Sequence, residues 1–120
     1  MAAAVTNAQY SDTYIAKSCG TMAAQGSPMS AHAQSSLAER EIGGDHAHHT
    51  SQPVTEELLS WAHVVVPLTE SHNSQLLFAF PDHADKLRPF ASDISDPFGG
   101  NLQDYRRCLE DICSGLEWLL

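Results

Sequence analysis

A chain of 120 residues is long enough for one domain and too short for two. Its 42% of hydrophobic and 18% of charged residues are typical of a globular protein rather than of a disordered segment. The net charge of −9 opposes binding to nucleic acid, and no basic amphipathic stretch favours a membrane surface. The longest aliphatic run, residues 64–66, is far too short to span a bilayer, and the N-terminus has no signal-peptide pattern.

The first half of the chain predicts two helices and one strand. Residues 1–10 are rich in alanine and predict a helix, whereas the β-branched and aromatic residues 13–17 predict a short strand. Ser30 is an expected N-cap for a second helix that runs to about Ile42, where two glycines stop it.

The second half of the chain also alternates between predicted helices and predicted strands. Thr55 is expected to cap a short helix over residues 56–61, and Thr69 to open another. The run at 64–66 predicts a strand covered on both faces, and residues 86–90 a weak last strand. Asn101 caps the clearest helix. Its apolar residues recur at spacings of three and four: Leu102, Tyr105, Leu109, Ile112, Leu116 and Leu119.

The alternation of helices with short apolar strands defines the expected fold class. We predict a single α/β domain over residues 1–120, with three layers and a mainly parallel sheet that carries helices on both faces. Only three strands are found, which is few for such a sheet. The three cysteines, an odd number without disulfide-scaffold spacing, favour a reducing cytoplasm.

Four segments form a pattern along nearly the whole chain: Ser18-Cys19-Gly20-Thr21, His49-Thr50-Ser51-Gln52-Pro53-Val54-Thr55, Ala62-His63-Val64-Val65-Val66-Pro67-Leu68-Thr69, and Asp96-Pro97-Phe98-Gly99-Gly100 followed by Tyr105. In this order they resemble the low-molecular-weight protein-tyrosine phosphatases and their protein-arginine phosphatase relatives. The resemblance implies a phosphorylated protein, with phosphotyrosine or phosphoarginine, as partner and substrate. It implies no metal and no cofactor.

The mechanism implied by the resemblance is nucleophilic. A Cys-x5-Arg-Ser loop between the first strand and first helix binds the phosphate, and its thiolate attacks phosphorus. None of Cys19, Cys108 and Cys113 is followed by arginine at that spacing. The nucleophile and the arginine are therefore absent from this sequence, and we expect the chain as given to be inactive.

The start of the chain suggests a reason. In the family the phosphate loop ends Cys-Arg-Ser-Pro and commonly continues Met-Ala, and this sequence begins Met1-Ala2. Met1 then resembles an internal methionine, and the first central strand and the nucleophile loop would be missing. Either the reading frame begins upstream, which we favour, or the gene has lost the segment.

Four site residues follow from the resemblance. Asp96 is the expected general acid, with a plain Asp-Pro turn as the alternative. Phe98 is expected at the substrate rim, or else as a core contact that anchors the loop. Ser18 and His49 match positions that support the phosphate loop from behind.

Other residues have simpler interpretations. Cys19 is expected to be a small buried residue, and Arg107 and Asp111 to form an i, i+4 pair on a solvated helix face. The histidine-rich segment invites a metal-site hypothesis, although a solvated loop is favoured: Asp45, His46, His48 and His49. The alternative function is a non-catalytic pseudophosphatase that binds a partner protein through the rim formed by Asp96 and Phe98, and the oligomeric state stays open.

Overall fold

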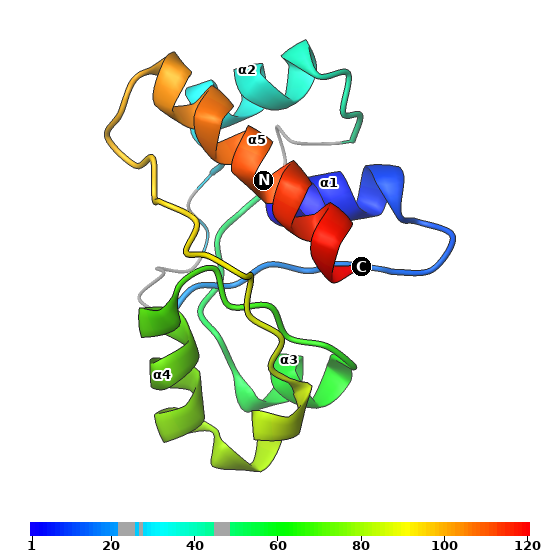
Figure 1. Cartoon of the computed structure of the whole chain (residues 1–120), viewed down its shortest axis with the longest axis vertical. Coiled ribbons are helices and arrows are strands. Elements are labelled where there is room, and N and C mark those ends of the chain that lie inside the picture. Colours follow the sequence, from blue (N-terminus) through cyan, green and yellow to red (C-terminus); the bar gives the residue numbers. More distant parts are fainter. Residues whose placement is uncertain (22–25, 27, 45–48) are drawn as a thin grey trace.

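The computed structural model describes residues 1–21, 26, 28–44 and 49–120, and its regular elements are helices (Figure 1). They are α1 (Ala2–Gln9), α2 (Ala31–Glu39), α3 (Glu56–Trp61), α4 (Glu70–Ala79), the 3₁₀ helix η2 (Pro81–Lys86) and α5 (Leu102–Leu119). Figure 1 shows α1, α2 and α5 together at one end of the molecule and α3 and α4 at the other, with extended segments between the two groups. We call the first group the core half, and α3, α4 and η2 the peripheral half.

The predicted apolar face of α5 builds the core. Leu109 and Ile112 on this helix are 0% and 2% exposed, and they pack with Val5 of α1 and Leu37 of α2. The same cluster takes in Ile42, Phe90, Ile94, Cys108 and Leu116. Because the apolar stripe of one long helix faces two shorter helices, the core half buries most of the apolar side chains.

The predicted helix starts are confirmed by side-chain caps. The hydroxyl groups of Ser30, Thr55 and Thr69 accept hydrogen bonds from backbone N–H groups in the first turns of α2, α3 and α4. Such caps satisfy N–H groups that have no partner within a helix, which is why these residue types mark the starts reliably.

The end of α2 differs from the prediction. The helix stops at Glu39, about one turn before Ile42. Glu41 adopts a positive φ of 59°, and the N–H of Ile42 donates to the carbonyl oxygen of Leu37 at 3.0 Å. This left-handed turn directs Ile42 back into the core, where its side chain is 4% exposed, so an apolar residue after the helix was counted as part of it.

The predicted strands are reduced to isolated bridges among the described residues. The expectation of a strand at residues 13–17 was wrong, because the backbone of Ala16 pairs with a side chain instead. The amide of Asn7 donates to the carbonyl oxygen of Ala16 at 2.9 Å and accepts from its N–H at 2.8 Å. A side-chain amide offers the same donor and acceptor as a peptide group, so Asn7 of α1 takes the place of a neighbouring strand.

The segment at residues 64–66 was also expected to be a strand covered on both faces, and this is wrong. Val65 forms only an isolated parallel bridge with Leu87, and the Val64 side chain is 44% exposed. Gly20 forms a second isolated parallel bridge, with Pro53. A β-ladder requires several consecutive residue pairs joined by backbone hydrogen bonds, and each of these two segments pairs with its partner at one residue only. The parallel direction that was predicted is nevertheless kept in both bridges.

The peripheral half is joined by polar contacts more than by burial. His83 Nε2 of η2 lies 2.6 Å from Glu56 Oε1 of α3, and the Lys86 ammonium donates to the carbonyl oxygen of Leu59 at 2.7 Å. Leu59 and Leu76 are its buried apolar side chains, whereas Phe78 of α4 is 92% exposed. The Lys17 ammonium also lies over the ring of Trp61 in α3, 4.3 Å from the ring centroid.

Candidate active site

The segment that carries Asp96 is a tightly hydrogen-bonded turn, which we call the acid loop (residues 95–100). Asp96 Oδ1 accepts from the N–H of Phe98 at 2.9 Å, and the N–H of Gly100 donates to the carbonyl oxygen of Pro97 at 2.8 Å. Gly99 has a φ of 80°, which glycine adopts without strain. The segment forms a turn, which holds one carboxyl oxygen of Asp96 while the other has no hydrogen bond to a described residue.

The acid loop is fastened to the start of α5 by a capping box. Asn101 Oδ1 accepts from the N–H of Asp104, and Asp104 Oδ2 accepts from the N–H of Asn101, both at 3.0 Å. Gly100 fits only because it has no side chain, since a Cβ there would meet the Asp104 carboxylate and lie 2.9 Å from the carbonyl oxygen of Pro97. The position of Asp96 is thus set by the longest helix of the core half.

A cavity of about 430 Å³ lies between the acid loop and one stripe of α5. From α5 it is lined by residues spaced three or four apart, which share one face of the helix: Asp104, Arg107, Cys108 and Asp111. Asp96 and Phe98 line it from the loop, and Phe98 is 86% exposed. Phe98 therefore stands at the rim of this cavity and does not make the core contact that was the alternative.

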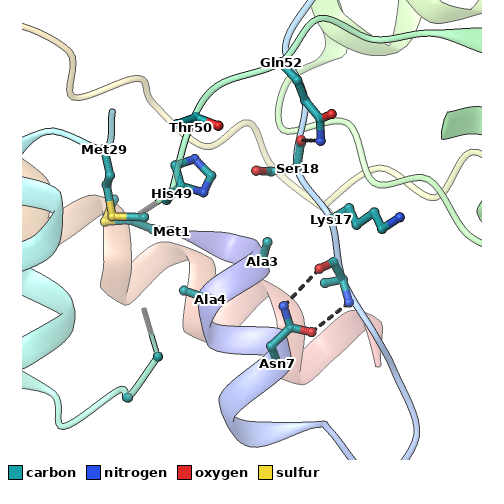
Figure 2. Close-up of a pocket in the computed structure, with 13 residues that line it drawn as sticks. Met1, Ala3, Ala4, Asn7, Lys17, Ser18, Met29, His49, Thr50 and Gln52 are labelled. Carbon is teal, nitrogen blue, oxygen red and sulfur yellow. Dashed lines mark hydrogen bonds between the residues drawn. The ribbon is translucent and has the colours of Figure 1, made fainter. Parts of the chain in front are cut away.

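Ser18 and His49 meet at a second cavity, of about 370 Å³, beside the first turn of α1 (Figure 2). Figure 2 shows Ser18 on the segment that follows Lys17 and His49 on the segment that leads to Gln52. The Gln52 side-chain amide donates to the carbonyl oxygen of Ser18 at 2.9 Å and ties these two segments together. The structure thus pairs Ser18 with His49 and Asp96 with Phe98, each pair at its own cavity.

The three thiols are poorly suited to nucleophilic attack. Burial raises the pKa of Cys108, and the nearby carboxylates of Asp111 and Asp96 raise it further, against an opposing effect of the Met1 amine. Desolvation also raises the pKa of Cys19 and of Cys113. A nucleophilic cysteine needs a lowered pKa, so all three thiols stay protonated near neutral pH. Contrary to expectation, Cys19 reaches the surface, because residues 13–19 lie along the outside without a covering strand.

The polar face of α5 is exposed as predicted, but its ion pair differs from the prediction. Arg107 and Asp111 both line the cavity but do not form the expected ion pair. The ion pair on this face joins Arg106 to Glu39 of α2, with Nε–Oε2 and Nη2–Oε1 distances of 2.7 and 3.0 Å. Arg107 and Asp111 are both exposed, so the expected solvated face is confirmed, but that interpretation did not indicate that the two residues also line a cavity. Their spacing from Asp104 was the available signal.

The remaining features concern metal binding and membrane insertion. Across residues 1–21, 26, 28–44 and 49–120, no group of three or more His, Cys, Asp or Glu is placed to hold a metal ion. Asp45, His46 and His48 of the metal-site hypothesis lie outside the described residues. Within the described part of the chain, no helix has the length and apolar character needed to cross a bilayer.

The fold and the sequence both have close counterparts. The structure of YwlE arginine phosphatase from Geobacillus stearothermophilus superposes with a TM-score of 0.88 at 30% identity, over 97% of this chain and 78% of that one. A low molecular weight protein tyrosine phosphatase from T. tengcongensis superposes with a TM-score of 0.87 at 29% identity, over 97% and 84%. The expected α/β fold class of these phosphatases is therefore confirmed, although strand pairing is reduced to isolated bridges in the part of the chain that the structure describes.

The sequence comparisons lead to the family. A protein-arginine-phosphatase of Geobacillus stearothermophilus is 37% identical over 103 residues, which cover 80% of this chain and 68% of the relative. One from Bacillus subtilis (strain 168) is 29% identical over 103 residues, or 80% and 67%. The family described as low molecular weight phosphotyrosine protein phosphatase matches residues 1–120. The chain belongs to this family.

Proposed function

We propose that this chain carries the acid-loop part of a protein phosphatase that dephosphorylates phosphoarginine or phosphotyrosine in a phosphoprotein. Asp96 is its general acid. The observation that supports the proposal most directly is the hydrogen bond from the N–H of Phe98 to Asp96 Oδ1, which orients the carboxyl group beside the cavity. The second carboxyl oxygen can then donate a proton to the departing nitrogen or phenolic oxygen.

The proposed substrate class is supported by the sequence relatives and by the exposed ring of Phe98 at the rim of the cavity. Both sequence relatives named above are protein-arginine phosphatases, which favours phosphoarginine. The exposed ring of Phe98 offers an apolar wall on which the planar guanidinium or phenol of a phosphorylated side chain can stack. Ser18 and His49 keep the proposed role of supporting a phosphate-binding loop beside the first turn of α1.

The 120-residue chain is proposed to lack hydrolytic activity by itself. The sequence holds no Cys-x5-Arg, and all three of its thiols have raised pKa values, so none supplies a thiolate. These same observations favour the second candidate function, a non-catalytic domain that binds a partner protein through Asp96 and Phe98.

A chimaera separates the two candidates. A segment with the phosphate-loop pattern Cys-x5-Arg-Ser-Pro that the family resemblance implies is joined in front of Met1, and hydrolysis of phosphoarginine is measured for the chimaera and for the chain alone. We expect activity in the chimaera only. Asp96→Asn in the chimaera lowers kcat roughly 10²-fold or more, whereas the matched control Asp82→Asn, an exposed aspartate of η2, does not. A folded chimaera without activity would favour the pseudophosphatase. Full activity after Asp96→Asn would contradict the role of Asp96 as general acid.

A further inference from the structure

The first turns of α5 are fixed by burial, whereas the acid loop in front of them is not. Tyr105 in the first turn is 7% exposed, and its ring centroid lies 5.7 Å from that of His32 in α2. Cys108 and Leu109, one turn further along, belong to the core cluster. None of the acid-loop residues is buried, so the loop depends on hydrogen bonds for its shape.

Asp104 is the side chain that joins the fixed start of α5 to the acid loop. Its Oδ2 atom accepts from the N–H of Asn101, the residue that follows the loop, at 3.0 Å. The same carboxylate lies against Gly100, the last residue of the loop, where a Cβ would collide with it. The Asp104 carboxylate therefore holds the backbone at the C-terminal end of the acid loop, by one hydrogen bond and one close contact.

Two hydrogen bonds lead from this end of the loop back to Asp96. The N–H of Gly100 donates to the carbonyl oxygen of Pro97 at 2.8 Å, and the N–H of Phe98 donates to Asp96 Oδ1 at 2.9 Å. The carbonyl of Pro97 and the N–H of Phe98 belong to one planar peptide group. Because that group is rigid, the hydrogen bond that fixes its carbonyl also fixes the direction in which its N–H meets the Asp96 carboxylate.

We infer that Asp104 is a positioning residue, which orients the general acid Asp96 through the peptide group between Pro97 and Phe98. This inference rests on the proposed function, and it deepens that function by naming the residue that aims its acid. A general acid must reach the leaving atom within hydrogen-bond distance, so a misdirected Asp96 slows proton donation and leaves substrate affinity unchanged. Loss of a capping acceptor changes the ratio of ordered to disordered forms about fivefold.

Hydrogen exchange in the 120-residue chain tests whether Asp104 holds the loop, and it needs no turnover. NMR measures exchange of the backbone amides of Phe98 and Gly100, which we expect to be about fivefold faster in Asp104→Ala. The amide of the buried Leu109 should be unchanged, because the middle of α5 is fixed independently. Asp104→Glu keeps a carboxylate acceptor and should restore slow exchange. The matched control is Glu110→Ala, which removes the same charge from an exposed position of α5 and should have no effect.

The effect on proton donation is measured in the chimaera described above. Asp104→Ala should lower kcat about twofold or more, with KM unchanged, and Asp104→Glu should restore it. In an Asp96→Asn background, Asp104→Ala should lower kcat no further, because Asp104 acts through the Asp96 carboxylate. A residue with a merely structural role would lower kcat equally in both backgrounds.

Four results would overturn the inference. They are unchanged exchange of the Phe98 and Gly100 amides in Asp104→Ala, an unchanged kcat, an equal loss of kcat with and without the Asp96 carboxylate, and an equal effect of Glu110→Ala, which would indicate net charge alone. Failure of the proposed function gives different results, namely an inactive folded chimaera or full activity after Asp96→Asn. The exchange measurement does not depend on turnover, so the two failures are distinguishable.

Discussion

The core half and the peripheral half each contain three of the described helices but differ in how they are held together. In the core half, α5 packs against α1 and α2, and the side chains of Leu37 and Leu109 are completely buried. In the peripheral half, α4 contacts η2, which follows it directly in the chain, and Phe78 projects into solvent. The acid loop leads directly into α5, which is the helix with the most buried side chains. The molecule thus places its proposed chemistry on its better-packed half.

The difference has a simple physical origin. In α5 apolar residues recur at helical spacing and give one continuous stripe, whereas in α4 the neighbours Leu76 and Leu77 point to different sides, so that one is buried and the other 41% exposed. A stripe can be buried against two other helices, but scattered apolar residues cannot. Polar contacts such as that of His83 with Glu56 then hold the peripheral half.

The largest expected effect comes from removing a buried side chain of the core half. Leu109→Ala leaves a cavity in a completely buried position and should lower the free energy of unfolding by about 3 kcal/mol. Leu77→Ala in the peripheral half makes the same chemical change at a partly exposed position and should cost less than about 1 kcal/mol. Urea unfolding followed by far-UV circular dichroism measures both. Equal losses would erase the distinction between the halves.

A smaller effect is expected where α5 meets the segment that precedes the acid loop. Gly115 lies against Phe90, and a Cβ at this position would lie 2.6 Å from Cε1 of the Phe90 ring. Gly115→Ala should therefore lower the free energy of unfolding by about 1–3 kcal/mol, although alanine favours helix. Ser114→Ala, at the exposed neighbouring position, is the control and should be neutral or slightly stabilising. Thermal unfolding measures the stability of both variants, and a Gly115→Ala variant more stable than the unaltered chain would contradict the close packing of Gly115 against Phe90.

The smallest effect concerns the polar contact of the peripheral half. The hydrogen bond with His83 is the main cause that lowers the pKa of Glu56 in the folded chain. A carboxyl group with a lowered folded pKa contributes stability above its unfolded pKa, and this contribution is lost as the pH falls through the folded value. The urea midpoint of the unaltered chain should slightly exceed that of Glu56→Gln near neutral pH and converge with it below about pH 4. A difference that persists in acid would point to another cause.

Local signals were sufficient for the helices and for the shape of the acid loop. Ser30, Thr55 and Thr69 cap helices through their own hydroxyl groups, so short stretches of sequence contain the information. The strands failed for the opposite reason, because whether Ala16 joins a ladder depends on what lies beside it, and here that is the Asn7 side chain. The cavity beside Arg107 was not predicted either, since an exposed polar helix face does not reveal which of its positions lie beside a neighbouring loop.

The extended segment near Ala16 and Lys17 has a consequence for how the two halves communicate. Ala16 is held by Asn7 of α1, and the very next residue, Lys17, lies over Trp61 of α3. Adjacent residues of one extended strap are thus fastened to different halves, because consecutive groups of an extended backbone point in opposite directions. The indole of Trp61 therefore lies beside the residue that follows the attachment to α1, and its fluorescence should report on whether this segment stays in place.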